Sequence, residues 1–333
     1  MFKFKRLRLA FVLTIVMLLL LSMTSGAQKV FKLPHSHSGE TPTTLGCYYF
    51  ADRIEELTDG EIKIEVFIGG VLGSEMETME QLLEGTIEMN RVSATNLGES
   101  VAPMMDIFGI PYLFKNEQHF LNVIHGDIGR ELAATCENYG VKLLTYFYTG
   151  SRSVYNKVRP INTPDDLKGL KIRVMGSELM INTMKALGAS PTTTAYSEVY
   201  SALQTGVIDG GENPPASVVD MSFYEVADYY SLNEHFTIPD VIVMSKEVWD
   251  DLEPLHKAIF LRVARETEIY VHELVTKALK ESLEIIEESG TKVNTVSDEN
   301  KALFIEKVKP IHEELKAKGT FCGYIERIQS IAE

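Results

Sequence analysis

The sequence predicts an α/β protein of two domains, built on parallel or mixed sheets. Short apolar stretches alternate with segments of helical periodicity, and this β-α-β-α order favours sheets with helical crossovers. About 300 mature residues with 45% hydrophobic content can bury a sizeable core, and two domains are expected at this length. The amphipathic stretch from Pro254 to Gly290 predicts a helix of about 54 Å, longer than one small domain is wide.

The N-terminus has the pattern of a secretory signal. Four basic residues precede an apolar stretch from Leu9 to Leu21, and Ser25-Gly26-Ala27 supplies small residues for cleavage. This stretch is short for a membrane span, although an uncleaved anchor is the alternative. The lack of a cysteine near the cleavage site argues against a lipoprotein. We therefore expect residues 1–27 to be a cleaved signal peptide and the mature protein, beginning at about Gln28, to be periplasmic.

The first unit is expected to end near Gly150. Its strands are expected at residues 30–33, 62–66, 87–92 and 141–148, and its helices at 42–58, 76–84 and 116–138. Pro42 suits the first turn of a helix, and Gly85 and Gly140 follow the ends of two others. In the second unit we expect a strand at 171–174, a helix at 177–187 closed by Gly188, and a helix at 198–205 capped by Ser197. The long helix should lie across both units.

The net charge of the chain argues against some classes of binding partner. The formal net charge is −15 at pH 7, and loss of the four basic residues of the signal takes it to about −19. A chain this acidic is a poor candidate for binding nucleic acid or anionic lipid. It also repels anionic ligands, so an anion site would depend on local arginines, with the background screened beyond about 8–10 Å.

Cysteine and histidine do not predict a metal site. The chain has three cysteines, an odd number, and they are widely spaced: Cys47, Cys136 and Cys322. We expect them to be small packed residues, and a disulfide between one pair is the alternative. The eight histidines lack the spacing of a metal cluster, although His35 and His37, after a strand, could line a polar site. We expect neither metal nor cofactor.

An anion clamp is predicted between residues 165 and 214. Arg173 lies at the end of a short apolar strand, a helix follows, and Asn213 lies in a loop bounded by glycine and proline. A guanidinium matches a carboxylate with two parallel hydrogen bonds, and an amide can orient it or bond the ligand. Arg152 follows another predicted strand, and ligands of open α/β sheets lie beyond the carboxyl ends of strands.

Two segments at matching spacing resemble the solute-binding proteins of tripartite ATP-independent periplasmic (TRAP) transporters, which import organic acids. They are residues 168–174 (Lys-Gly-Leu-Lys-Ile-Arg-Val) and 209–214 (Asp-Gly-Gly-Glu-Asn-Pro). The resemblance runs from about residue 30 to the C-terminus. It implies a two-domain periplasmic-binding-protein-like fold with crossing interdomain strands, a domain-spanning helix and the ligand in the cleft. Domain I would comprise residues 28–150 and about 239–278, and domain II residues 151–238 and about 279–333.

The resemblance also implies a set of ligand-binding residues. Arg173 matches the carboxylate-binding arginine, Arg152 a second arginine of the site, Asn213 the Glu-Asn-Pro motif, and Tyr196 an aromatic that stacks on the ligand. From the residues alone, Arg173 could be a surface arginine, Arg152 a salt bridge near the hinge, Asn213 a turn residue and Tyr196 a core aromatic. Glu75, Ser93, His35 and His235 match ligand-lining positions that vary among members of the family.

The ligand is expected to be a hexuronate such as glucuronate or galacturonate. Glu75 would accept hydrogen bonds from hydroxyls and repel a second carboxylate, and the segment around Glu234-His235 and Pro239-Asp240 resembles the hexuronate branch. Pro214 departs from that branch, where a second asparagine is common. Sialic acid, four-carbon dicarboxylates and 2-oxo acids remain alternatives.

The expected partners are a small organic acid and the membrane permease subunits of the transporter, with no nucleic acid, and the protein is expected to be monomeric. An extracytoplasmic sensor domain would use the same fold and site. A secreted hydrolase is the alternative from another class. The chain lacks both a Gly-x-Ser-x-Gly and a His-Glu-x-x-His motif, so we expect no enzyme activity.

Overall fold

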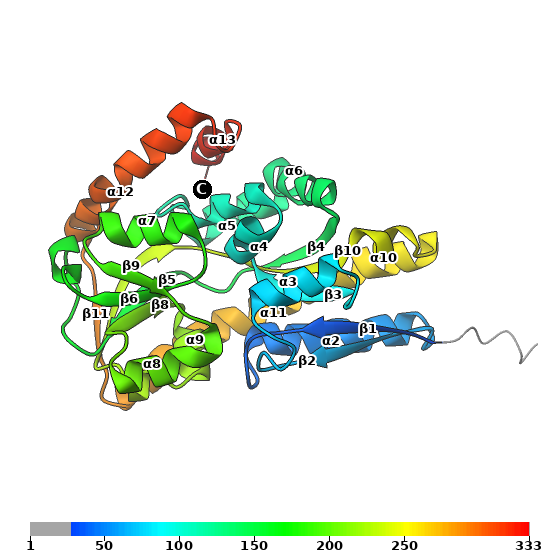
Figure 1. Cartoon of the computed structure of the whole chain (residues 1–333), viewed down its shortest axis with the longest axis horizontal. Helices are drawn as coiled ribbons and strands as arrows, with labels where there is room; N and C mark the ends of the chain where they lie inside the picture. The colour runs from blue at the N-terminus through cyan, green and yellow to red at the C-terminus, as the bar shows by residue number, and fades with distance from the viewer. Residues whose placement is uncertain (1–27, 333) are drawn as a thin grey trace, which may run out of the picture.

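The structure of the protein, a computed structural model, describes residues 28–332. The predicted signal peptide and its cleavage site lie outside the described residues. Two α/β lobes lie side by side, and Figure 1 shows that strands pass between them near the middle of the molecule. Among residues 28–332, none of the helices has both the length and the apolarity needed to cross a membrane. The two-domain α/β fold with mixed sheets is as predicted.

The first lobe is built on two small sheets. One pairs β1 (Lys29–Pro34) with β2 (Ile62–Phe67) in parallel, and the other has β10 (Asp240–Ser245) antiparallel to both β3 (Met89–Ser93) and β4 (Val141–Phe147). In β2, buried Ile62 and Ile64 alternate with less buried Lys63 and Glu65, as a strand with one face on a core requires. The helices of this lobe are α2 (Pro42–Leu57), α3 (Glu75–Leu83), α4 (Ala94–Ser100), α5 (Glu117–His125), α6 (Asp127–Cys136) and α10 (Lys246–Asp250), with 3₁₀ turns η1 (Pro103–Gly109) and η2 (Glu137–Tyr139).

The second lobe is built on one sheet of six strands in the order β11-β9-β5-β8-β6-β7. Strand β5 is antiparallel to its two neighbours, whereas the other pairs are parallel. The strands are β5 (Arg152–Asn156), β6 (Lys171–Val174), β7 (Ser190–Thr193), β8 (Gly210–Asn213), β9 (Tyr229–Phe236) and β11 (Lys292–Thr295). The helices are α7 (Glu178–Ala186), α8 (Val199–Thr205) and α9 (Pro215–Asp220), with 3₁₀ turns η3 (Pro164–Leu167), η4 (Tyr196–Glu198) and η5 (Phe223–Glu225).

Two short connections join the lobes, from β4 to β5 and from β9 to β10. They lie against each other, because the Thr149 hydroxyl donates to the Ile238 carbonyl oxygen at 3.0 Å and the Ser151 and Thr237 hydroxyls are 3.2 Å apart. These connections contain residues 148–150 and 237–239, where we expect the hinges of any motion between the lobes.

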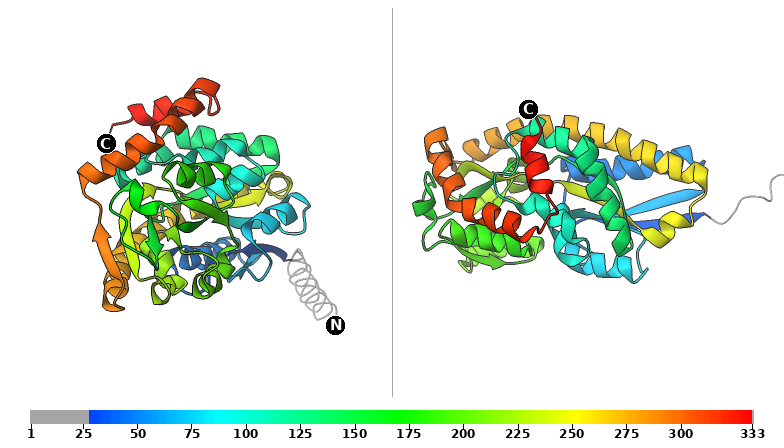
Figure 2. Two further views of the ribbon diagram at one scale, coloured as in Figure 1. Left: turned by 60° about the vertical axis from the view of Figure 1, so that its left-hand side comes forward. Right: turned by 90° about the horizontal axis from the view of Figure 1, so that it is seen from above.

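A third connection is the long helix α11 (Pro254–Glu288), which Figure 2 shows running along both lobes. Its N-terminal half buries Phe260, Val263 and Val271 and packs on α2 and β4, while Ile286 belongs to the core of the second lobe. It is followed by α12 (Asp298–Lys318) and α13 (Tyr324–Ser330). Helix α13 packs on α6 of the first lobe, although the predicted boundaries assign it to domain II. The exact division of the chain remains a prediction.

Three local predictions were wrong. Asn213 was expected in a loop but is the last residue of strand β8. The helix expected over residues 116–138 is interrupted at Gly126, whose backbone is extended between α5 and α6. The start of α6 is so close to the end of α5 that a Cβ on Gly129 would lie 2.0 Å from the Ile124 carbonyl oxygen. Ser197 does not cap α8, because it lies inside the 3₁₀ turn η4 and α8 begins at Val199 without a side-chain cap.

Candidate functional site

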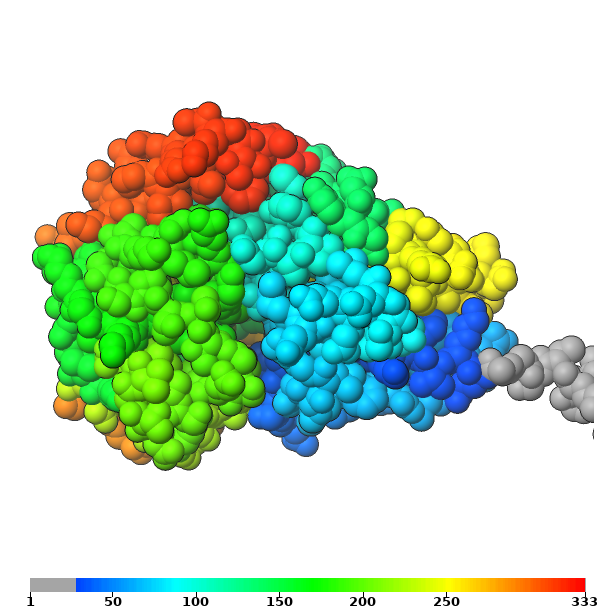
Figure 3. All heavy atoms as spheres, viewed as in Figure 1, coloured from blue at the N-terminus to red at the C-terminus, as the bar shows by residue number. Residues whose placement is uncertain are grey.

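A cavity of about 550 Å³ lies between the two lobes. Its walls come from β3, α3 and the loop after β1 on one side, and from β6, β8 and η4 on the other. Figure 3 shows the two lobes meeting along a line across the face of the molecule. The volume is in the ordinary range for small-molecule sites, and a position between domains is a common one for such sites.

Arg173 lies on the second lobe's side of the cavity with one donor group unused. Its Nε and Nη2 donate to the Thr194 carbonyl oxygen at 2.9 and 2.7 Å. Its Nη1 is buried and has no hydrogen-bond partner among the described residues. Burial lowers the pKa of Arg173 from its usual range, against the opposing effects of Tyr155 and Glu212. A buried cation with an unpaired donor can stabilise an anion in the cavity.

Arg152 forms a buried ion pair with Glu212 and also lines the cavity. Its Nε donates to Glu212 Oε2 at 2.5 Å, and its Nη2 donates to Oε1 at 2.9 Å and to the Glu212 carbonyl oxygen at 2.6 Å. Burial would lower the pKa of Arg152, but Glu212 outweighs it and the pKa is raised. Arg152 is therefore part of a buried salt bridge and also part of the cavity wall.

Asn213 is the last residue of β8 and lies beside this pair. Its amide fits best with the nitrogen 2.7 Å from the Glu212 carbonyl oxygen and the oxygen 3.3 Å from Arg152 Nη2. Gly211 lets β8 run close to β5, since a Cβ there would lie 2.4 Å from the Tyr155 hydroxyl. Strands β6 and β8 are parallel neighbours, so Arg173 and Asn213 reach the same edge of the sheet.

Tyr196 covers this part of the cavity. Its ring lies 4.9 Å from that of His37 and 6.0 Å from the Arg173 guanidinium carbon, and its hydroxyl donates to the Ser217 carbonyl oxygen at 3.3 Å. Burial raises the pKa of Tyr196, so the phenol stays neutral at physiological pH. The ring is both a neighbour of the core and a wall of the cavity.

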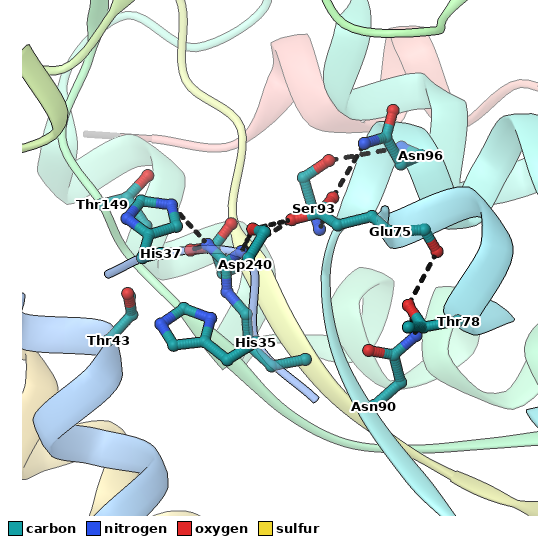
Figure 4. A network of polar contacts seen from close by, with 12 residues as sticks. His35, His37, Thr43, Glu75, Thr78, Asn90, Ser93, Asn96, Thr149 and Asp240 are labelled. Atoms are coloured by element: carbon teal, nitrogen blue, oxygen red, sulfur yellow. Dashed lines mark hydrogen bonds and ion pairs between the residues drawn. The ribbon is translucent and has the colours of Figure 1, made fainter. Parts of the chain in front are cut away.

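Glu75 lies on the opposite wall and is fully bonded by protein donors. It accepts from Arg91 Nη1 at 2.7 Å, the Ser36 hydroxyl at 2.9 Å, the Ser93 backbone N–H at 3.0 Å and Asn96 Nδ2 at 2.8 Å. Burial would raise the pKa of Glu75, but Arg91 and these donors lower it. Figure 4 shows this polar network of the first lobe, with Glu75, Ser93 and Asn96 close together.

Ser93 and Asn96 add polar groups to this wall. The Ser93 hydroxyl caps α4 by accepting from the Asn96 backbone N–H at 3.4 Å. The Asn96 Oδ1 is buried and has no hydrogen-bond partner among the described residues. It is therefore an acceptor that a ligand hydroxyl could satisfy.

Two of the predicted site residues, His35 and His235, do not line the cavity of the described structure. His35 is buried behind His37 and lies 2.9 Å from the Thr44 hydroxyl. His235 is fully buried with its Nδ1 3.1 Å from Asn233 Oδ1, and burial, with Arg152, lowers its pKa to about 3. His235 is fully buried within β9, and His35, which directly follows β1, is buried against Thr44, so a direct contact of either side chain with the ligand is not supported.

Several cavity residues were not predicted as binding residues, among them Asn96, described above, and Arg91, Asp240 and His37. Arg91 in β3 is buried between Glu75 and Asp240 and forms an ion pair with each. The sequence could have indicated Arg91, because it is a charged residue within an expected strand. Asp240 was noted only as part of the segment that resembles the hexuronate branch. His37 lies with its Nε2 3.4 Å from Arg91 Nη2, and was noted only as possible polar lining.

The two walls differ in the formal charge of their arginines taken together with the carboxylates that these arginines face, while the exposed Glu77 and Glu198 add one carboxylate to the lining on each side. On the second lobe, Arg152 and Arg173 face one carboxylate, Glu212, which leaves one positive charge. On the first lobe, Glu75 and Asp240 share one cation, Arg91, which leaves one negative charge. Across residues 28–332, no cluster of three or more His, Cys, Asp or Glu side chains could hold a metal ion. The site is suited to a ligand that is anionic at one end only.

The comparisons with known proteins agree with this geometry. Residues 33–318 match the family model of the bacterial extracellular solute-binding proteins, family 7. A TRAP periplasmic solute-binding protein from Roseobacter denitrificans, solved with bound β-D-glucuronate, is 33% identical with a TM-score of 0.88, covering 91% of this chain and all of its own. One from a Sulfitobacter species with bound β-D-galacturonate is 33% identical with a TM-score of 0.87 at the same coverage. One from Sulfurospirillum deleyianum with bound succinate is 29% identical with a TM-score of 0.86, covering 92% of this chain and all of its own.

Proposed function

The chain belongs to family 7 of the bacterial extracellular solute-binding proteins, and from that premise we propose that its cavity captures a hexuronate for a TRAP transporter. D-Glucuronate and D-galacturonate are the expected ligands, enclosed between the two lobes and delivered to the membrane permease subunits. The observation that carries the proposal is the buried, unpaired Nη1 of Arg173 in a cavity with one positive and one negative wall.

The ligand carboxylate belongs on the second lobe. Arg173 and Asn213 would bind it, Arg152 would bind it or a ring oxygen nearby, and Tyr196 would cover an apolar face of the sugar. A carboxylate placed here gives Arg173 Nη1 the partner that it lacks, and a charge-assisted hydrogen bond in a buried site is a strong one. Because Arg152 is already held by Glu212, its position does not depend on the ligand.

The ligand hydroxyls belong on the first lobe. Glu75 already accepts hydrogen bonds from four protein donors, so its main role is to position the side chains of Arg91 and Asn96. Asn96 Oδ1 and the Ser93 hydroxyl are then the groups that remain for ligand hydroxyls, because His37 faces Arg91 and Asp220 with its two ring nitrogens. The net negative charge of this wall opposes a second carboxylate, which favours a polyhydroxylated monoacid over a dicarboxylate.

The resemblance to a succinate-binding protein keeps a four-carbon dicarboxylate as the second candidate, because overall structural similarity does not separate it from the uronates. Sialic acid and 2-oxo monoacids are also anionic at one end only, so the charge of the walls leaves them as alternatives to the uronates. We also propose that the protein acts in the periplasm, after cleavage of the N-terminal signal, and that it releases its ligand unchanged, as a carrier and not an enzyme.

A competition titration tests the proposal. Glucuronate and galacturonate should bind more tightly than succinate or malate, because a site built for hydroxyls keeps unpaired polar groups when an analogue lacks them. Binding is measured by calorimetry, and NMR of the recovered ligand checks that it is unchanged. Tighter binding of succinate or malate would overturn the hexuronate assignment and leave the family assignment intact. A consumed ligand would overturn the carrier assignment.

A further inference from the structure

The loop after β1 touches the end of α9 across the cleft. His37 Nδ1 lies 3.4 Å from Asp220 Oδ2, and the Ser38 hydroxyl lies 3.8 Å from the Met221 sulfur. The loop belongs to the first lobe and α9 to the second, on the strand side of the cavity where β8 ends. This contact therefore forms only when the two lobes are close.

Two aromatic rings pack against the ring of His37. The His35 ring is stacked on one side at 5.1 Å, and the Tyr196 ring lies at 4.9 Å. His35 and His37 lie next to each other in Figure 4. Tyr196 belongs to the second lobe, so the imidazole fills a position between a residue of its own lobe and one from across the cleft.

The neighbours of His37 determine its protonation. Its Nε2 lies 3.4 Å from Arg91 Nη2, and a guanidinium can only donate, so this nitrogen must be the acceptor. The proton of the neutral ring then lies on Nδ1, which faces Asp220. Burial and Arg91 lower the pKa of His37, against Asp220 and Glu75, and so favour this neutral form.

The two facing atoms lack other partners. His37 Nδ1 and Asp220 Oδ2 are both buried and make no hydrogen bond within residues 28–332, because their present geometry is just short of one. A buried polar atom without a partner is costly, so a slight further approach of the lobes is favoured by this pair. His37 lines the cavity, whereas Asp220 is not among the described residues that do.

We propose that Asp220 is a positioning residue for ligand binding, which accepts a hydrogen bond from His37 across the cleft and thereby fixes the imidazole in the cavity and holds the lobes closed. The inference rests on the proposed function, since it requires a ligand that the closed cavity encloses. Arg91 then donates to His37 and His37 donates to Asp220, so the three residues form one chain of hydrogen bonds that runs from the first lobe to the second.

Calorimetry with D-glucuronate tests the inference. Asp220→Asn keeps the shape of the side chain but replaces a charged acceptor with a weaker neutral one, and should weaken binding about tenfold. Asp228→Asn removes an exposed carboxylate from the same lobe and should bind as the wild type does. Thermal unfolding without ligand should be the same for all three proteins, because the contact forms on closure.

A double-mutant cycle separates this role from a general structural one. His37→Phe keeps a ring against His35 and Tyr196 but has no donor toward Asp220, so adding Asp220→Asn to it should change the affinity by less than twofold. NMR of the imidazole should also show a lower pKa of His37 in Asp220→Asn, because Asp220 raises it in the wild type.

Two results would overturn the inference alone: wild-type affinity in Asp220→Asn, or the same loss in the His37→Phe background as in the wild type. Failure of the wild type to bind any uronate would instead overturn the proposed function, and the inference with it.

Discussion

At the scale of single residues, Arg173 is expected to contribute most to affinity. Arg173→Ala should nearly abolish binding, at a cost of about 2–5 kcal/mol, because the ligand carboxylate would be buried without its charged partner. Arg173→Lys should also fail, since a point charge does not replace the planar fork that Thr194 holds in place. Calorimetry measures both variants.

The matched control is Arg130→Ala, which removes an exposed arginine of α6 and should leave the affinity unchanged. Circular dichroism should show that each variant keeps its fold. Wild-type affinity in folded Arg173→Ala would remove Arg173 from the site.

The residues show what the sequence could and could not predict of the site. Six of the eight predicted residues lie in the cavity wall, because strand ends and the spacing of the two segments indicate where polar groups converge. His35 and His235 lie behind the wall, since the direction of a side chain depends on how its segment packs in the fold. The pairing of Arg91 with Asp240 depends on β3 lying beside β10, a long-range contact that local patterns do not contain.

At the scale of elements, the second lobe meets the first where the N-terminus of α7 contacts η1. The Ser177 hydroxyl donates to Asp106 Oδ1 at 2.7 Å, and Glu99 and Glu178 lie nearby. Burial, with these two acids, raises the pKa of Asp106 from 3.8 to about 7. The folded protein therefore keeps a proton on Asp106 that the unfolded chain has lost, between about pH 4 and pH 7.

Asp106→Asn should for this reason stabilise the protein at pH 8 and have little effect near pH 4. The wild type loses stability as the pH rises from about 4 to about 7, because only its folded state still holds the proton on Asp106. The amide of Asp106→Asn does not titrate, so the variant should not lose stability for this reason. The gain at pH 8 should be about 1–2 kcal/mol, less than the full pKa shift implies because the carboxyl is only partly buried. Urea unfolding at several pH values measures it, with the exposed Asp251→Asn as control. A gain that does not depend on pH would contradict the assignment.

Helices and strands were predicted correctly where the spacing of apolar residues within the segment determines its structure. The long helix was predicted at 254–290 and lies at 254–288, because its apolar positions keep helical spacing throughout. The prediction at 116–138 failed because the interruption at Gly126 follows from the packing of α5 against α6, while the helical pattern continues across it. Strand β8 was missed, since its four residues include two glycines whose place in the sheet depends on β5 and β6.

At the scale of the whole molecule, the cavity wall is divided between two lobes that are joined by short connections. A ligand that binds both walls favours the closed form, and the lobes should close about residues 148–150 and 237–239 while α11 bends or pivots. Closure is also what the permease must detect, because a ligand with equal affinity for open and closed forms could not change their populations.

Small-angle scattering should show this closure as a smaller radius of gyration with saturating glucuronate than without it. Arg173→Ala supplies the control, because at the same glucuronate concentration it should keep the radius of the unliganded wild type. An unchanged radius in a wild type that calorimetry shows to be saturated would contradict closure. The carboxylate and hydroxyl sites would then have to be complete before the ligand arrives, and the permease would have to recognise the ligand by some change other than the distance between the lobes.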